Sequence, residues 1–109
     1  IAGIKGIGSS IAYAASKGAL NTMTLSMARN LCPIRVNAIC PGFIEGEWLE
    51  KGMGTEMYEA VKSHVKATTP LKKTCSPESI AEVIFSIIEA SELMTGQLIT
   101  VDGGASLNL

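Results

Sequence analysis

Two short apolar segments, each preceded by a helix-like stretch, constrain the fold of this chain most. Residues 34–40 and 97–101 are short and rich in β-branched side chains, which is typical of strands. Both segments carry apolar residues on both faces, as expected of a sheet that helices cover on each side. Helical sequence between two such strands predicts a parallel pair with a right-handed crossover, and therefore an α/β fold. Because two strands alone make a poor sheet, we expect partner strands upstream of Ile1.

Helices are predicted on either side of the first strand segment. One follows Ser9 or Ser10, either of which can cap it, and extends to about residue 31. The last follows Thr74 or Ser76 and has Pro77 in its first turn. Apolar residues recur in it at helical spacing, so we expect this helix in the core. These residues are Ile80, Val83, Ile84, Ile87 and Ile88.

Residues 53–67 predict a third, weakly amphipathic helix, flanked by glycines at 46, 52 and 54. A helix between flexible loops beside a ligand site suits a lid, and an ordinary surface helix fits the pattern equally well. We expect the only histidine, His64, to pack or to face solvent. The predicted inner face comprises Met57, Ala60, Val61, His64 and Val65.

The first eight residues are rich in glycine and predict a loop that leads into the first helix. Their spacing is not that of a GxGxxG phosphate-binding loop. They resemble the exit of an element already under way, so we expect the 109 residues to be part of a longer chain.

Composition narrows the class of protein. The chain is 47% hydrophobic and 17% charged, with a net charge of −1, which predicts one globular domain. There is no basic excess for nucleic acid and no apolar run long enough to cross a membrane. We expect a cytoplasmic protein without a metal site. Its cysteines, Cys32, Cys40 and Cys75, are then reduced thiols that are buried or half-buried.

Tyr13 and Lys17 lie four residues apart in the first predicted helix, so their side chains share one face. The ammonium favours the phenolate form, which suits a group that exchanges a proton during a reaction. Such pairs also occur by chance on solvated helices. The neighbouring residues are small, and Gly18 is costly inside a helix. Both features suggest close approach of another backbone or a ligand.

Three short motifs occur in order across nearly the whole chain. Residues 13–17 match a YxxxK motif, residues 35–42 match RVNxxxPG, and residues 95–104 contain TGQ and VDGG. Together they resemble the C-terminal part of a classical short-chain dehydrogenase/reductase. The resemblance implies that residues 1–109 are a C-terminal fragment of one Rossmann-like domain with three αβα layers. The chain would hold about two strands of its parallel sheet and three to four helices.

The resemblance also implies an activity and a set of site residues. The family interconverts alcohols and ketones by hydride transfer, with NAD or NADP as cofactor. Tyr13 would be the catalytic acid and base, and Lys17 would bind the nicotinamide ribose and assist Tyr13. Pro41, Gly42 and Ile44 would line the nicotinamide pocket. For Gly42 there is also a reason independent of the family, because glycine permits close approach of a ligand to the backbone.

The chain departs from the family pattern in three respects. The catalytic serine of the family would fall just before Ile1, and Ser9 and Ser10 are too close to Tyr13 to replace it. The glycine-rich dinucleotide loop is absent, and Gly46 stands where a cofactor-binding threonine is common. We therefore expect the 109 residues alone not to bind a dinucleotide tightly or to turn over.

Two hypotheses follow for the protein. The first is an oxidoreductase of a small-molecule alcohol or ketone that works as a homodimer or homotetramer. The second is a non-catalytic, truncated family member that acts as an oligomerisation or binding module through Met23, Met27 and the 80–88 face. A serine just upstream of Ile1 would favour the enzyme. The segment 43–69 would set the substrate, and Asn37 and Asp102 would support the structure.

Overall fold

The computed structural model describes residues 1–108, so Leu109, where the expected domain ends, lies outside the described residues. Five α-helices and two strands occur within these residues, against the three to four helices expected. In chain order they are α1 (Ala2–Lys5), α2 (Ile11–Asn30), β1 (Ala38–Pro41), α3 (Glu47–Met53), α4 (Thr55–Thr68), α5 (Pro77–Ile88), β2 (Leu98–Val101) and a 3₁₀ helix (Ala105–Asn108).

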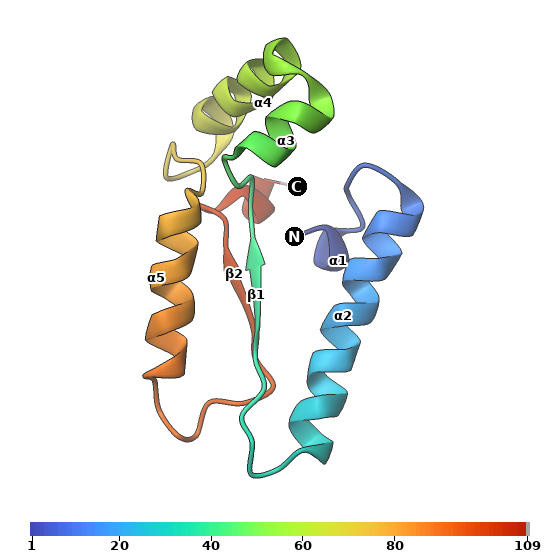
Figure 1. The fold of residues 1–109 in the computed structure, drawn as a ribbon, viewed down its shortest axis with the longest axis vertical. Helices are drawn as coiled ribbons and strands as arrows, with labels where there is room; N and C mark the ends of the chain where they lie inside the picture. Colours follow the sequence, from blue (N-terminus) through green and yellow to red (C-terminus); the bar gives the residue numbers. More distant parts are fainter. Residues whose placement is uncertain (109) are drawn as a thin grey trace.

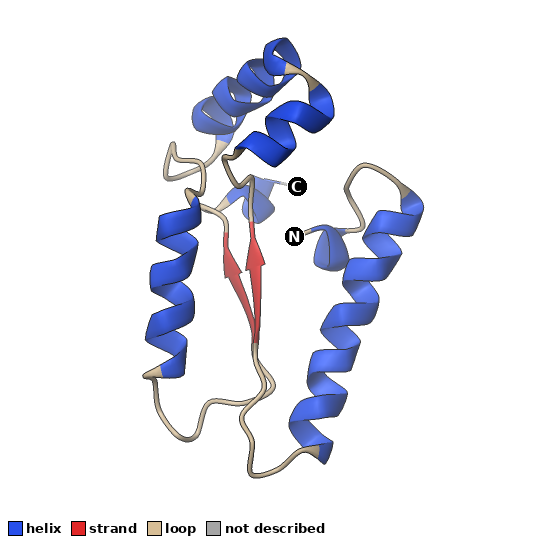
Figure 2. Cartoon of the chain, in the orientation of Figure 1, coloured by secondary structure: helices blue, strands red, loops and turns tan. Residues whose placement is uncertain are grey.

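The two strands pair in parallel, with Ala38 opposite Leu98 and Pro41 opposite Val101. Helix α2 lies on one side of them and α5 on the other, which gives three layers (Figure 1). Helices α3 and α4 lie beyond the carboxyl ends of the strands, as the colouring by secondary structure also shows (Figure 2). The α/β expectation with a parallel sheet is confirmed.

The first strand is shorter than expected, because it begins at residue 38 rather than 34. The preceding residues use their side chains to hold distant segments. The Arg35 guanidinium donates to the Ile88 carbonyl at 2.9 Å, at the end of α5, and to the Met94 carbonyl at 3.3 Å. Asn37 donates to the Met94 carbonyl and accepts from the Gln97 amide, each at 3.0 Å. Asn37 therefore supports the structure, as expected.

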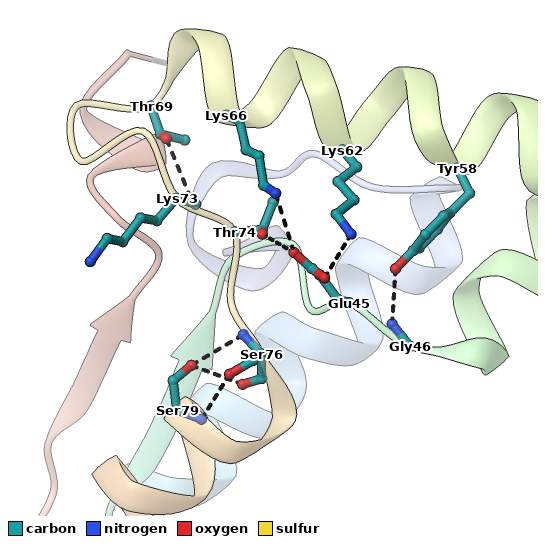
Figure 3. Close-up of polar contacts among 10 residues, drawn as sticks. All are labelled: Glu45, Gly46, Tyr58, Lys62, Lys66, Thr69, Lys73, Thr74, Ser76 and Ser79. Carbon is teal, nitrogen blue, oxygen red and sulfur yellow. Dashed lines mark hydrogen bonds and ion pairs between the residues drawn. The ribbon is translucent and has the colours of Figure 1, made fainter.

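Serine caps begin the two helices that flank the sheet. The Ser10 hydroxyl accepts from the Tyr13 amide at 3.1 Å and satisfies one of the free amides of the first turn of α2. Ser76 and Ser79 form a reciprocal capping box at the start of α5, with Pro77 as its first residue (Figure 3). Of the caps considered from sequence, Ser10 and Ser76 are the ones used.

The expected loop at residues 1–8 is wrong in its first half, which forms α1. Gly6, at φ 68°, adopts the left-handed conformation that ends this helix. Helix α1 is held by its contact with α2, because a Cβ placed on Gly3 would lie 2.5 Å from the Lys17 carbonyl carbon. A contact between segments, rather than local propensity, therefore forms this helix.

The helix expected at 53–67 is α4, which begins at Thr55 because Gly54, at φ 86°, separates it from the helix before it. Helix α3 was not expected. The buried residue of α4 is Tyr58, whereas Met57, placed on the inner face from sequence, is 57% exposed. His64 is exposed, which agrees with the expectation that it packs or faces solvent.

The core is small, and α5 contributes less to it than expected. Only Ile80 of this helix is buried, whereas Phe85 and Ile88 are 65% and 62% exposed. Cys40 and Cys75 are buried free thiols, but Cys32 is exposed, contrary to expectation. Within residues 1–108, no helix has both the length and the apolar character needed to span a bilayer.

Candidate active site

Tyr13 and Lys17 project from the same face of α2, one turn apart. The Lys17 ammonium nitrogen lies 5.4 Å from the centre of the Tyr13 ring, within the range of a cation–π contact. Both side chains are exposed, and Tyr13 is 42% accessible. Neither the phenol oxygen nor the ammonium has a hydrogen-bond partner among the described residues. These two groups are therefore free to bind a ligand.

One cavity of about 460 Å³ brings together all five site residues identified from sequence. Tyr13 and Lys17 come from α2, and Pro41, Gly42 and Ile44 come from the end of β1 and the loop after it. In open α/β sheets, ligands bind beyond the carboxyl ends of the strands, which is where this loop lies. Residues 24 or more positions apart in sequence thus meet at one place.

The cavity also holds residues that sequence reasoning missed. Asn21, half-buried, lies one turn beyond Lys17, with its side-chain oxygen 3.9 Å from the Cys40 sulfur. The four-residue spacing of Tyr13, Lys17 and Asn21 was the available signal. Trp48, which lies in the segment expected to set the substrate, lines the cavity from α3, although that helix itself was not expected.

Gly42 is explained by a neighbour within the chain. A Cβ on Gly42 would lie 2.9 Å from the Cβ of Asp102, so this glycine permits the ends of the two strands to approach. Gly42 thus has a structural reason beside the expected approach of a ligand, which stays a prediction. At Gly18 another backbone does approach, that of α1, but a Cβ there would lie an ordinary 3.8 Å from the Gly3 carbonyl oxygen, so alanine would also fit. The residue of this helix contact that must be glycine is Gly3.

Asp102 stabilises the turn after β2. Its two carboxylate oxygens accept from the amides of Gly104 and Ser106, each at 2.8 Å. Burial, the largest single effect, raises the pKa of Asp102, but these hydrogen bonds together outweigh it and the pKa lies below its usual value. Asp102 thus has the structural role expected of it.

Glu45 connects the loop after β1 to two other segments (Figure 3). Its carboxylate lies 2.8 Å from the Lys62 ammonium and 4.0 Å from that of Lys66, both on α4. It also accepts from the Thr74 hydroxyl, before α5. The hydrogen bonds from Lys62 and then Thr74 hold the pKa of Glu45 below its usual value. The hydrogen bond between Lys62 and Glu45 also raises the pKa of Lys62. Within residues 1–108, no cluster of three or more potential ligands could hold a metal ion.

A three-layer α/β fold with a Tyr–Lys pair facing a strand-end loop defines a Rossmann-like class of protein. A family model described as enoyl-(acyl carrier protein) reductase matches residues 1–106. The short-chain dehydrogenase/reductase homolog YusR of Bacillus subtilis is 42% identical over 108 residues, which cover 98% of this chain and 78% of that protein. The chain belongs to the short-chain dehydrogenase/reductase family.

Other relatives are longer. The 3-oxoacyl-[acyl-carrier-protein] reductase FabG of Thermotoga maritima is 38% identical over 107 residues, which cover 95% of this chain but 42% of that protein. A solved 4-hydroxyisoleucine dehydrogenase complexed with NADH has a TM-score of 0.83 at 31% identity, with 97% of this chain and 44% of that chain covered. A small-chain dehydrogenase solved with NADPH has a TM-score of 0.80 at 37% identity, with 86% and 42% covered. The chain thus spans about two fifths of the length of these three proteins.

Proposed function

We propose that the protein is a cytoplasmic NAD- or NADP-dependent oxidoreductase that interconverts an alcohol and a ketone by hydride transfer. The observation that carries the proposal is the single cavity in which a phenol and an ammonium face the loop after β1. Family membership supports the reaction class. The relatives solved with NADH and NADPH support the cofactor.

The cavity residues fit a nicotinamide cofactor. The cavity volume falls in the range of small-molecule sites. The Lys17 ammonium supplies donors for ribose hydroxyls, and the Asn21 amide supplies a further donor and acceptor for a polar group. Ile39, Phe43 and Ile44 provide an apolar wall for a flat ring. Tyr13, Lys17, Pro41, Gly42 and Ile44 would hold the nicotinamide half of the cofactor.

The reduced cofactor supplies the hydride, and the oxidised form accepts it. The Tyr13 hydroxyl binds the substrate oxygen and gives up its proton as a ketone becomes an alcohol, or takes that proton in the reverse direction. Lys17 stabilises the phenolate left behind, because its positive charge lies one helical turn away. The apolar residues of α3 and of the loop before it line the same cavity and offer an apolar surface to the substrate.

Replacing Tyr13 tests this proposal in the complete protein. Tyr13→Phe should abolish turnover, because it removes the only proton-exchanging oxygen of the Tyr–Lys pair and keeps the ring. Cofactor binding, followed by fluorescence titration, should be largely retained. Tyr58→Phe is the matched control for kcat, since the other tyrosine of the chain does not line the cavity. Its hydroxyl accepts a hydrogen bond from the Gly46 amide at 3.2 Å, at the cavity loop, so any loss in this variant should fall on KM. Near wild-type turnover by Tyr13→Phe would show that Tyr13 lacks this role.

A second candidate function is a non-catalytic oligomerisation or binding module. The observation that favours it is the exposed apolar surface of α2 and α5, where Met23 is 50% and Ile88 62% exposed. A homodimer or homotetramer formed through these helices is compatible with either candidate. Turnover of small alcohols or ketones with NAD(H) or NADP(H) separates the two. An assembled protein that is inactive with both cofactors would favour the module.

A further inference from the structure

The Glu45 carboxylate joins three segments that meet beside the cavity. Glu45 itself lies in the loop that lines the cavity, between Ile44 and Gly46. One of its oxygens is 2.8 Å from the Lys62 ammonium of α4, and the other accepts from the Thr74 hydroxyl (Figure 3). Both oxygens of this side chain are therefore used in contacts between separate elements.

The backbone fixes only part of this arrangement. The Glu45 amide donates to the Cys75 carbonyl at 2.8 Å, and the Cys75 amide donates to the Phe43 carbonyl at 2.9 Å. These bonds hold the loop to the segment before α5 without involving α4. The polar contacts of α4 with the loop come from side chains instead, namely Lys62 and Lys66 with Glu45, and Tyr58 with Gly46. The placement of the middle of α4 over the loop thus depends on Glu45, whereas Tyr58 holds the first turn of the helix.

The opposite end of α4 is held separately. The Asn108 side-chain amide donates to the Thr68 carbonyl at 2.8 Å, and the Leu71 amide donates to the Gly103 carbonyl at 3.0 Å. Helix α4 therefore has one end attached to the C-terminal segment, while its middle is attached through Glu45. Loss of the Glu45 contacts would free the middle of α4 and leave its C-terminal end in place.

The position of α4 affects the cavity through α3. The two helices are consecutive, pack against each other, and are separated only at Gly54. Helix α3 contributes Trp48 and Leu49 to the cavity wall. We propose that Glu45 is a positioning residue that holds the α3–α4 pair over the cavity and thereby raises the affinity for substrate. This inference rests on the proposed oxidoreductase function of the same cavity.

The Glu45 pair differs from an ordinary surface ion pair. The side chains of Lys62 and Glu45 are 23% and 29% exposed, whereas those of Lys51 and Glu47, paired within α3, are 79% and 85% exposed. Exposed pairs within one helix contribute little to stability because water and salt screen them. The Glu45 contacts are less solvated and connect different elements. Their loss should therefore have a measurable effect on the placement of α3 and α4.

The test uses Glu45→Gln in the complete protein, with two measurements. We expect amide hydrogen exchange in residues 47–68 to be about three- to ten-fold faster, with exchange in α2 unchanged. We expect KM for the substrate to rise by a similar, roughly three- to ten-fold factor while kcat changes less than about two-fold. Saturating substrate should bring α3 and α4 back over the cavity, so the loss of the Glu45 contacts should raise KM rather than lower kcat.

Two further variants sharpen the test. Lys62→Met should reproduce both effects, and combining it with Glu45→Gln should add little, because both changes remove the same contact. Glu56→Gln is the control, since Glu56 is an exposed carboxylate of α4 that makes no ion pair with the described residues. It should leave exchange and KM as in the wild type. Fully additive effects of the two substitutions, or equal effects of Glu56→Gln, would refute the proposal.

The two measurements separate the failure of this inference from that of the proposed function. A wild-type protein that does not turn over any alcohol or ketone overturns the oxidoreductase proposal, and the exchange rates still decide whether Glu45 holds α4. Unchanged exchange in Glu45→Gln refutes the inference even if the enzyme is active. Faster exchange with an unchanged KM also refutes it, because substrate affinity would then not depend on the placement of α3 and α4.

Discussion

The contact between α1 and α2 offers a sharp test of the structure, because it contains two glycines of different kinds. Gly3 leaves no room for a larger residue, whereas Gly18 does. A Cβ on Gly3 would lie 2.5 Å from the Lys17 carbonyl carbon and 2.6 Å from the Gly18 amide nitrogen. These are backbone atoms of a 20-residue helix and cannot move aside alone. A Cβ on Gly18 would meet only the Gly3 carbonyl oxygen, at 3.8 Å.

The two substitutions to alanine should therefore change the free energy of unfolding in opposite directions. Both residues lie in helices, where alanine is favoured over glycine by about 1 kcal/mol. Gly3→Ala also introduces overpacking, which typically costs about 1–3 kcal/mol. Because the helix gain is common to both variants, the difference between their free energies of unfolding isolates the overpacking. We expect Gly18→Ala to be more stable than Gly3→Ala by about 1–3 kcal/mol.

Denaturant unfolding of the complete protein and its two variants, monitored by circular dichroism, measures this difference. Gly3→Ala should also weaken cofactor binding, since α1 lines the cavity beside Lys17 and must move away from it. Equal stability of the two variants, or lower stability of Gly18→Ala, would show that α1 does not pack on α2 as described.

Two further predictions concern carboxylates. The pKa of Glu45 is lowered in the folded protein, so the unfolded chain binds more protons, and stability should fall as the pH drops below about 4.5. Unfolding measured between about pH 3 and 6 should show a weaker pH dependence for Glu45→Gln, and an unchanged slope would contradict the contact with Lys62. Asp102→Asn should cost about 1–3 kcal/mol in denaturant unfolding, because an amide has one acceptor oxygen for the two amides that Asp102 serves. A cost no larger than that of an exposed control, Glu82→Gln, would refute the turn-stabilising role.

The parts of the fold that were predictable from sequence have local causes. Ser10 and Ser76 are capping residues next to helical sequence, and their caps fix where α2 and α5 begin. Tyr13 and Lys17 share a face because the helical repeat requires it. The two apolar segments pair in parallel because helices separate them. The caps and the shared helix face follow from residues within a few positions of one another, and the parallel pairing follows from the order of strands and helices along the chain.

The errors have non-local causes. Residues 34–37 have the composition of a strand, but Arg35 reaches the carbonyls at the end of α5, more than 50 residues away, and sheet pairing begins only at Ala38. Helix α1 is only four residues long and contains a glycine, and it forms against α2. The exposure of Phe85 could not be predicted either, since the helical pattern shows which face is apolar but not what covers it.

The candidate site likewise has a part with local causes and a part with non-local causes. The residues proposed for proton exchange and cofactor binding stand in short motifs whose spacing sets their geometry, so the sequence identifies them. The cavity wall depends on where α1 and α3 pack, which Gly3 and the contacts of Glu45 determine through residues distant in sequence. Because we propose that the wall holds the substrate and that the Tyr–Lys pair transfers the proton, substitutions in the wall should change KM more than kcat. Substitutions in the Tyr–Lys pair should change kcat, and this contrast separates positioning from chemistry in one protein.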